Sequence, residues 1–387
     1  MVNTAYIRDM EERVVSHART LVRMRSLTGA EDEIVSFLTN QYAGLGLSVE
    51  IVDKCNIVAT LKGTVGTPRL LFCGHHDHVF EGNPDHWMHN PFSAEIEGDC
   101  LYGRGAADAK GGVAAITAAL ETLCRSQTKL KGDLVLVVVR EEVIDLSDRG
   151  VIKVLNTGLN CDFGVVLEPT NLDVGLGHKG RVTAEFTTKG KAAHSSMPCK
   201  GVNAINHMAA VINEVNALQL PNRAPLGKGA LNVGRIEGGV LPSIVPDSCS
   251  LLVDRRITEG ETPESVLEEY QAVLNRLSQK ISNFNGALKV LTTFYPSRIG
   301  PEEKIVQSLL EAIKEADYSE SKTRYMDFHT DQEWLVNSAG IPCAILGPGK
   351  PEVAHTTNEF LSLWQLKKAA RIYLNLIINT LSLASRR

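Results

Sequence analysis

The feature that most constrains the fold is a set of short runs in which almost every residue is apolar. The clearest are DLVLVVV at 133–139, FGVVLEPT at 163–170 and LLFC at 70–73. Runs of this kind are typical of strands that are buried on both faces of a sheet. Amphipathic helical patterns, for example at 5–26 and 110–124, alternate with these runs. The sequence therefore predicts an α/β fold in which helices cover a sheet.

The strand pattern changes near Gly177, which indicates a second domain. RVTAEFTTKG at 181–190 alternates apolar and polar residues, as a strand with one exposed face does. Strands and helices then follow in the order β-α-β-β-α-β, which is typical of a small two-layer α+β domain. We therefore predict one domain formed by residues 1–178 and 296–387, with a second domain inserted at 179–295.

The net charge and the hydropathy pattern exclude several classes of protein. The 387 residues carry a formal net charge of −5, which argues against a nucleic-acid-binding protein with a broad basic face. No run of about 18 apolar residues occurs, so we expect no membrane-spanning segment and no membrane partner. The N-terminal residues lack the charged-then-apolar order of a signal peptide, and we expect a cytoplasmic protein.

Histidines and acidic residues gather where the apolar runs end. GHHDH follows LLFC directly, and ligands gather at the carboxyl ends of strands in α/β sheets. His75 and Asp77 alternate, so both side chains point to the same side of an extended segment. One of the two can bind a metal ion while the other orients it through a hydrogen bond.

Further carboxylates lie at similar places. Glu141 and Glu142 follow the run 133–139, and two adjacent carboxylates there repel each other unless a cation binds them. Glu168 ends the next apolar run. Asp108 lies in the glycine-rich segment YGRGAADAKGG before a helix, and taken alone it favours the role of a helix N-cap.

A second histidine completes this group of residues. His355 lies in AHTTNE, shortly after the apolar run IPCAILGPG. Two imidazoles and three carboxylates, each near the end of a strand, are ligands that suit zinc or manganese better than a soft metal ion.

Six motifs in one order resemble a known family. GHHDH, YGRGAADAKGG, EE, EPT, GKAAHSSMP and AHTTNE resemble co-catalytic zinc metallohydrolases in order and spacing. That family includes acetylornithine deacetylase, succinyl-diaminopimelate desuccinylase, aminoacylase and the bacterial glutamate carboxypeptidase. The resemblance implies a zinc-peptidase-like catalytic domain, with helices on both faces of a mixed sheet, in 1–178 and 296–387. It also implies that 179–295 is a lid and dimerisation domain.

The resemblance implies a role for individual residues. Up to two Zn²⁺ ions per subunit, with Co²⁺ or Mn²⁺ as substitutes, would be bound by His75, Asp108 as the bridge, Glu142, Glu168 and His355. Asp77 would orient His75, and a cis peptide would join Asp108 to Ala109. Glu141 would be the general base, and His194 would enter the active site of the partner subunit in a homodimer. Arg256 would bind the substrate carboxylate, and Gly349 would form a wall of the substrate pocket.

Four positions depart from the pattern of the family. Arg140 stands where the family has an aspartate, and His78 is open as an additional ligand or a hydrogen-bonding residue. Ser243 and His178, which we also expect to bind substrate, stand where relatives have an asparagine and a permanent cation. A site with fewer fixed donors discriminates less against acyl groups that lack a second carboxylate. We therefore expect a short uncharged acyl group rather than a succinyl group.

These roles predict the metal-dependent hydrolysis of an amide bond. A water between two zinc ions has its pKa lowered towards about 7, and Glu141 would remove its proton. The expected substrate is a small N-acyl amino acid, or a related amide, whose carboxylate binds Arg256. A surface ion pair of Arg256 with Asp254 or Glu261 is the alternative role of that arginine. A dipeptidase or carboxypeptidase, a hydrolase of a non-peptide C–N bond, and a scaffold protein without catalysis are the competing hypotheses.

Overall fold

The chain divides into two compact units. The computed structural model describes residues 2–141, 149–318 and 320–382. The first unit consists of Met1–Gly177, Arg298–Arg324 and Thr330–Arg387. The second unit consists of His178–Ser297 and Tyr325–His329.

The segment Tyr325–His329 differs from the sequence prediction, which placed it in the first domain. In the structure it contacts the second unit. The backbone N–H of Lys179 donates to the carbonyl of Met326 at 3.3 Å, and the Lys179 ammonium lies 2.6 Å from a carboxylate oxygen of Asp327. These contacts join segments that are far apart in the chain, and a local residue pattern does not reveal them.

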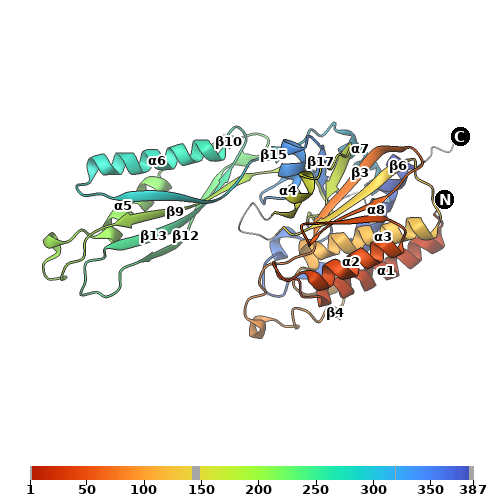
Figure 1. Cartoon of the computed structure of the whole chain (residues 1–387), viewed down its shortest axis with the longest axis horizontal. Coiled ribbons are helices and arrows are strands. Elements are labelled where there is room, and N and C mark those ends of the chain that lie inside the picture. Colours follow the sequence, from red (N-terminus) through yellow and green to blue (C-terminus); the bar gives the residue numbers. More distant parts are fainter. Residues whose placement is uncertain (1, 142–148, 319, 383–387) are drawn as a thin grey trace. The chain divides into compact units, whose positions relative to one another are not determined.

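The first unit is built on a mixed sheet, of which Figure 1 labels β3, β6 and β17. The strand order is β1-β2-β6-β3-β7-β17-β8-β15, and β16 pairs with β8. β3 runs parallel to β6 and β7, whereas β2 runs antiparallel to β6. All eight residues of β6 are buried, so both of its faces are covered, and the predicted α/β fold is confirmed. The strands of this sheet are β1 (Ser48–Val52), β2 (Asn56–Leu61), β3 (Gly66–His75), β6 (Gly132–Val139), β7 (Phe163–Val166), β8 (Val174–His178), β15 (Ser297–Arg298), β16 (Thr323–Met326) and β17 (Cys343–Ile345).

Helices that pack against one another and against this sheet supply the rest of the core. The predicted helices at 5–26 and 110–124 are confirmed as α1 (Thr4–Arg23), which Asn3 caps, and α3 (Gly111–Arg125). The other helices are α2 (Asp32–Gly44), α4 (Gly150–Leu155), α7 (Lys304–Glu315) and α8 (Leu363–Leu381). A small separate sheet contains β4 (Ile96–Glu97), β5 (Cys100–Tyr102) and β18 (Phe360–Ser362).

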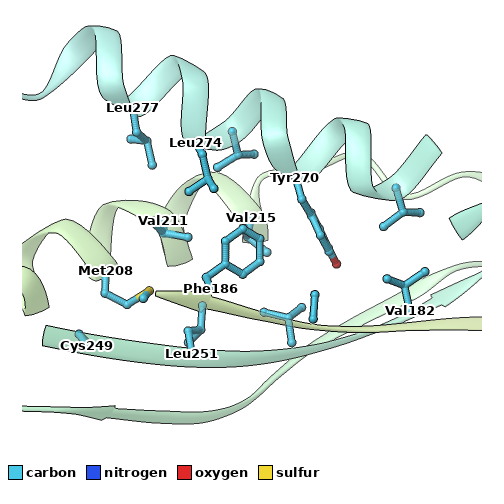
Figure 2. Close-up of a cluster of buried hydrophobic side chains, with 14 of the residues drawn as sticks. Val182, Phe186, Met208, Val211, Val215, Cys249, Leu251, Tyr270, Leu274 and Leu277 are labelled. Carbon is cyan, nitrogen blue, oxygen red and sulfur yellow. The ribbon is translucent and has the colours of Figure 1, made fainter. Parts of the chain in front are cut away.

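The second unit has a four-stranded antiparallel sheet with the order β12-β13-β9-β14. Burial alternates along β9 and β13, as the residue pattern predicts. The two helices α5 and α6 lie on the same face of this sheet (Figure 2). Between the sheet and the helices, Phe186 packs edge-on against Tyr270, with ring centroids 5.1 Å apart. The elements are β9 (Gly180–Lys189), α5 (Ala204–Asn216), β12 (Ala230–Gly238), β13 (Ser248–Ile257), α6 (Pro263–Lys280) and β14 (Gly286–Phe294), with a short pair, β10 (Asn222–Arg223) and β11 (Gly227–Lys228).

Candidate active site

Three neighbouring strands of the first unit bring the predicted ligands to one edge of its sheet. β3 ends at His75, β6 ends two residues before Glu141, and β7 ends two residues before Glu168. β3 lies between the other two strands and parallel to both. Their carboxyl ends therefore meet, and side chains that are distant in the chain become neighbours.

His75, Asp108 and Glu168 form a compact group of potential metal ligands. One ligand atom of each lies within 4.8 Å of those of the other two. Nε2 of His75 lies 3.0 Å from Oδ1 of Asp108 and 3.7 Å from Oε1 of Glu168. A nitrogen and two carboxylate oxygens converging on one point are a donor set that suits zinc.

Asp108 lies between two imidazoles. Its Oδ1 faces His75, while its Oδ2 lies 3.1 Å from Nε2 of His355. A carboxylate that presents one oxygen to each of two histidines has the arrangement of a bridging ligand. Glu142, the remaining predicted ligand, lies outside the described residues.

The charges at this site favour a bound cation. Burial, with Glu141 and Asp108 nearby, raises the pKa of Glu168 well above its usual value. Oε1 of Glu168 is buried, and no described residue forms a hydrogen bond with it. A divalent cation between these oxygens would offset both the repulsion and the desolvation. The residues present therefore fit a metal ion.

Asp77 connects the first ligand with the predicted base. Nδ1 of His75 donates to the backbone carbonyl of Asp77 at 3.0 Å, and Oδ1 of Asp77 lies 3.4 Å from the same nitrogen. This leaves Nε2 of His75 as the ligand atom. Oδ1 of Asp77 also accepts from the backbone N–H of Glu141 at 2.9 Å, and Oδ2 accepts from the hydroxyl of Thr28 at 2.9 Å. Burial opposes ionisation, but the bond to His75 keeps the pKa of Asp77 well below its usual range.

The glycine-rich turn around Asp108 is held by a residue to which the sequence assigned no role. Oε1 of Glu359 accepts from the backbone N–H groups of Ala107 and Asp108, at 2.9 and 3.2 Å. Arg104 donates to the other oxygen of Glu359 at 2.6 Å. The peptide between Asp108 and Ala109 is cis, as the family resemblance implies. Asp108 is not a helix N-cap, because Lys110 occupies that position of α3 and the Asp108 carboxylate faces the two histidines.

Two of the departures from the family pattern have structural explanations. His78 is buried, its Nε2 accepts from the backbone N–H of Ser26 at 3.1 Å, and its Nδ1 donates to the carbonyl of Val79 at 2.9 Å. With both ring nitrogens hydrogen-bonded, His78 is a structural residue and not an additional ligand. Arg140 forms a two-bond pair with the carboxylate of Glu31, at 2.6 and 2.7 Å.

Glu141 contacts Arg149, and Arg149 in turn contacts Asp331; the sequence analysis missed both of these residues. Nη2 of Arg149 donates to Oε1 of Glu141, and Nε of Arg149 donates to Oδ1 of Asp331 at 2.9 Å. Burial, followed by the charge of Glu141, raises the pKa of Asp331 to about 7. Neither Arg149 nor Asp331 belongs to a motif of chemical residues in the sequence, so no local pattern pointed to them.

Gly349, a predicted pocket residue of the first unit, lies beside the Asp108 turn. A Cβ atom built on Gly349 would lie 3.0 Å from Cβ of Ala107, and its φ of +103° favours glycine. Its backbone N–H donates to the side chain of Gln365 at 2.8 Å. A side chain at position 349 would therefore press on the turn that carries Asp108.

The remaining predicted residues belong to the second unit. His194 is exposed, and its Nδ1 accepts from the backbone N–H of Ser196 at 3.1 Å, which places the proton of the neutral ring on Nε2. The backbone carbonyl of Ser243 accepts from Ser195 at 2.9 Å. His178 is buried, with its Nδ1 3.0 Å from the carbonyl of Lys179.

Arg256 is partly exposed, and its Nε lies 2.8 Å from Oδ1 of Asp254. The alternative ion pair with Asp254 is thus formed in the structure. A partly exposed pair of this kind contributes little stability, so a substrate carboxylate could compete for the guanidinium.

The helices that the structure describes are too short or too polar to traverse a bilayer.

Comparisons with known proteins agree with the geometry. A deformylase of N-formyl-4-amino-5-aminomethyl-2-methylpyrimidine from Bacillus subtilis is 27% identical, over 96% of each chain. A succinyl-diaminopimelate desuccinylase from Dechloromonas aromatica is 30% identical, over 73% of this chain and 78% of the relative. The crystal structure of a tripeptidase from Staphylococcus aureus has the same fold, with a TM-score of 0.80 and 24% identity over 96% of this chain and 98% of the tripeptidase.

The family itself follows from the length of the match. The sequence pattern of peptidase family M20/M25/M40 matches residues 71–379, which is most of the chain and includes every described ligand candidate. Relatives in this family are metal-dependent hydrolases of amide bonds, among them deacylases and deformylases of small molecules. The protein therefore belongs to peptidase family M20/M25/M40, and it is a metal-dependent amidohydrolase.

Proposed function

We propose that the protein removes a short, uncharged acyl group from a small N-acyl amino acid or a related amide that bears a carboxylate. The observation that carries this proposal is the position of Asp108 between His75 and His355, with Glu168 and Glu141 beside them. We further propose zinc as the native metal and up to two ions in each subunit. His75, Asp108 and Glu168 would hold one ion, and Asp108, His355 and Glu142 would hold the other.

The chain's own residues have complementary tasks in the reaction. Bound zinc would polarise the amide carbonyl and make a water molecule more acidic. Oε2 of Glu141 lies 3.9 Å from Nε2 of His75. This short distance supports the proposed role of Glu141 as the base, which would remove a proton from water and donate it to the departing amine. Asp77 holds the backbone of Glu141 and the ring of His75, so the base and the ligand keep a constant separation.

A similar protein and one residue of the second unit support a small acyl group. The Bacillus subtilis relative acts on a formyl group, and its match covers almost the whole of both chains. Ser243 presents a shorter polar side chain than asparagine would, which favours small acyl groups with few polar atoms. The same relative supports a second candidate function, the hydrolysis of a non-peptide C–N bond whose amine is not an amino acid.

We also propose a homodimer formed through the second unit. β12 lies at one edge of its sheet, and a hydrophobic patch lies beside it. The patch consists of Met197, Ile236, Val240, Leu241 and Ile244, with exposed fractions from 41% to 85%. Apolar side chains this exposed are typical of an interface. His194 pairs with Ile244 through a β-bridge, so the patch would carry the Nε2 donor of His194 to a partner's site, where it would stabilise the oxyanion.

A substrate panel tests the function. N-formyl, N-acetyl and N-succinyl amino acids, dipeptides, N-carbamoyl amino acids and formamides without a carboxylate would be compared by kcat/KM with the zinc-loaded enzyme. We expect the N-formyl and N-acetyl amino acids to be hydrolysed fastest. Faster hydrolysis of dipeptides would instead identify a dipeptidase, and faster hydrolysis of the formamides would favour the second candidate. The cytoplasmic location stays a prediction.

A further inference from the structure

Arg149 is a buried arginine beside the active site that lies outside every motif of the sequence. Its side chain is 5% exposed. It contacts carboxylates from two other segments, Glu141 after β6 and Asp331 before the short helix at Trp334–Ser338. A buried arginine with two carboxylate partners is held firmly, because Nη2 and Nε of its planar guanidinium each form a charge-assisted bond with a different carboxylate.

The backbone of Arg149 is also fixed. Arg149 immediately precedes α4, and the N–H of the following Gly150 donates to the carbonyl of Arg140 at 2.9 Å. A Cβ atom at Gly150 would lie 2.1 Å from the side-chain oxygen of Asn56, so the start of α4 packs closely against β2. The position of the guanidinium is therefore fixed both by the backbone of Arg149 and by the bond to Asp331.

The contact with Glu141 distinguishes the two oxygens of that carboxylate. Oε1 accepts the hydrogen bond from Arg149, while Oε2 lies 3.9 Å from Nε2 of His75. A carboxylate without such a contact can rotate about its last bond, and the negative charges of Asp108 and Glu168 would push it away from the metal ligands. The arginine counteracts that repulsion and keeps one defined oxygen at the site.

We propose that Arg149 is a positioning residue for the base, which rests on the proposed role of Glu141. Asp331 anchors the guanidinium, the guanidinium holds Oε1 of Glu141, and Oε2 remains directed at the reacting water. Arg149 touches neither substrate nor metal in this scheme. Its loss should lower kcat while substrate binding and metal binding persist.

The experiment compares three variants of the contact network with the wild type and with control variants, all as full-length, zinc-loaded enzyme with N-formylmethionine as substrate. Arg149→Ala should lower kcat by about 10²-fold, because a misplaced base loses most of its contribution, and KM should change by less than about threefold. Arg149→Lys should recover part of the loss, since an ammonium supplies charge but only one contact. Asp331→Asn should lower kcat less than Arg149→Ala does. Guanidinium ion added to Arg149→Ala should restore several-fold activity.

Arg69 is the matched control. It is also an arginine of the first unit and lies within β3, but it bonds to the carbonyl of Asn160 and lies 3.9 Å from Asp133 at the opposite end of β6. Arg69→Ala should leave kcat unchanged. Zinc content by mass spectrometry and the midpoint of thermal unfolding should be measured for every variant, and the zinc content of Arg149→Ala should equal that of the wild type.

The outcomes separate this inference from the proposed function. If Glu141→Gln is inactive but Arg149→Ala and Arg149→Lys keep the wild-type kcat, the positioning role is wrong and the base stands. Loss of zinc from Arg149→Ala would also overturn it, because the arginine would then maintain the metal site. If Glu141→Gln keeps its activity, the base assignment fails and the role of Arg149 fails with it. If Arg149→Ala does not fold, the kcat and the zinc content of Arg149→Lys and Asp331→Asn test the positioning role instead. A wild-type kcat in both variants would overturn it.

Discussion

The candidate residues of the two units differ in how completely the chain itself holds them. In the first unit, His75, Asp77 and Glu141 are buried and joined by hydrogen bonds. In the second unit, His194 and Ser243 are exposed and Arg256 pairs with the partly exposed Asp254, whereas His178 is buried. The comparison indicates that contacts within the chain fix the proposed metal-site residues of the first unit more firmly than the proposed substrate-binding residues at the surface of the second unit.

Removal of the metal should have the largest effect, and it should act on the first unit. Chelation should abolish turnover, because no metal ion would then polarise the amide carbonyl or make a water molecule more acidic. It should also destabilise the first unit, because the carboxylates around Asp108 would lose the cation that offsets their repulsion. Ligand binding at a thousand times its dissociation constant stabilises a fold by about 4 kcal/mol. Differential scanning calorimetry should therefore show a lower unfolding temperature for the first unit and an unchanged one for the second. An equal shift of both transitions would contradict the comparison.

Glu141→Gln should reduce kcat by about 10³-fold, within the range that a general base contributes. Zinc content should remain at the wild-type level, because Glu141 is the base and not a ligand in this proposal. Glu142→Gln is the paired variant, and it should lower zinc affinity in a chelator competition. If Glu141→Gln lost zinc while Glu142→Gln kept it, the two roles would have to be exchanged.

His194→Ala should reduce kcat by about 10²-fold, which is the effect of losing one oxyanion donor. Its decisive test is a mixed dimer with Glu141→Ala chains, since one complete site can form from the two complementary halves. Recovered activity in the mixture would support the trans contribution. A fully active monomer of 42.1 kDa in light scattering would refute it.

Arg256→Ala should raise KM about tenfold for substrates with a free carboxylate, and hardly at all for their methyl esters. Arg276→Ala is the control, since Arg276 is a partly exposed arginine of the same unit that pairs with Glu214. Equal losses on acid and ester would assign Arg256 to its structural pair with Asp254.

Phe186→Ala should have the smallest effect on the catalytic site. The ring fills the core of the second unit against Tyr270, so its loss should cost about 3–5 kcal/mol of that unit's stability. Zinc affinity of the first unit should not change. A weakened zinc affinity, measured by competition titration, would show that the two units are coupled energetically.

The residue pattern was most informative where function and local structure coincide. Apolar runs predict the central strands, and a polar residue at the end of each run predicts the convergence of His75, Glu141 and Glu168. The turn that contains Asp108 could also be predicted from a local pattern, because several glycines surround it in the sequence. The family resemblance added the expectation that His355 joins these residues as a metal ligand. Its distance from them along the chain gives no such indication.

The contacts that support the site were much less accessible to sequence reasoning. Arg149 and Asp331 belong to none of the quoted motifs, and each resembles an ordinary surface charge when considered alone. Glu359 ends the motif AHTTNE, but its contact with the Asp108 turn joins segments about 250 residues apart. His78 lies within a ligand motif, and the sequence left open whether it binds metal or forms hydrogen bonds. In the structure both of its ring nitrogens form hydrogen bonds with the backbone.

The sequence by itself determined the α/β class, the inserted second unit, the family and the types of ligand atoms. Those properties follow from short-range periodicity and from residue chemistry, and both can be recognised in the sequence alone. Only the tertiary structure decided which oxygen of Asp108 faces which histidine, which carboxylate holds the Asp108 turn, and which arginine holds Glu141. Hydrogen bonds and ion pairs depend on distances of a few ångströms between segments that the fold brings together, and no local pattern encodes those distances.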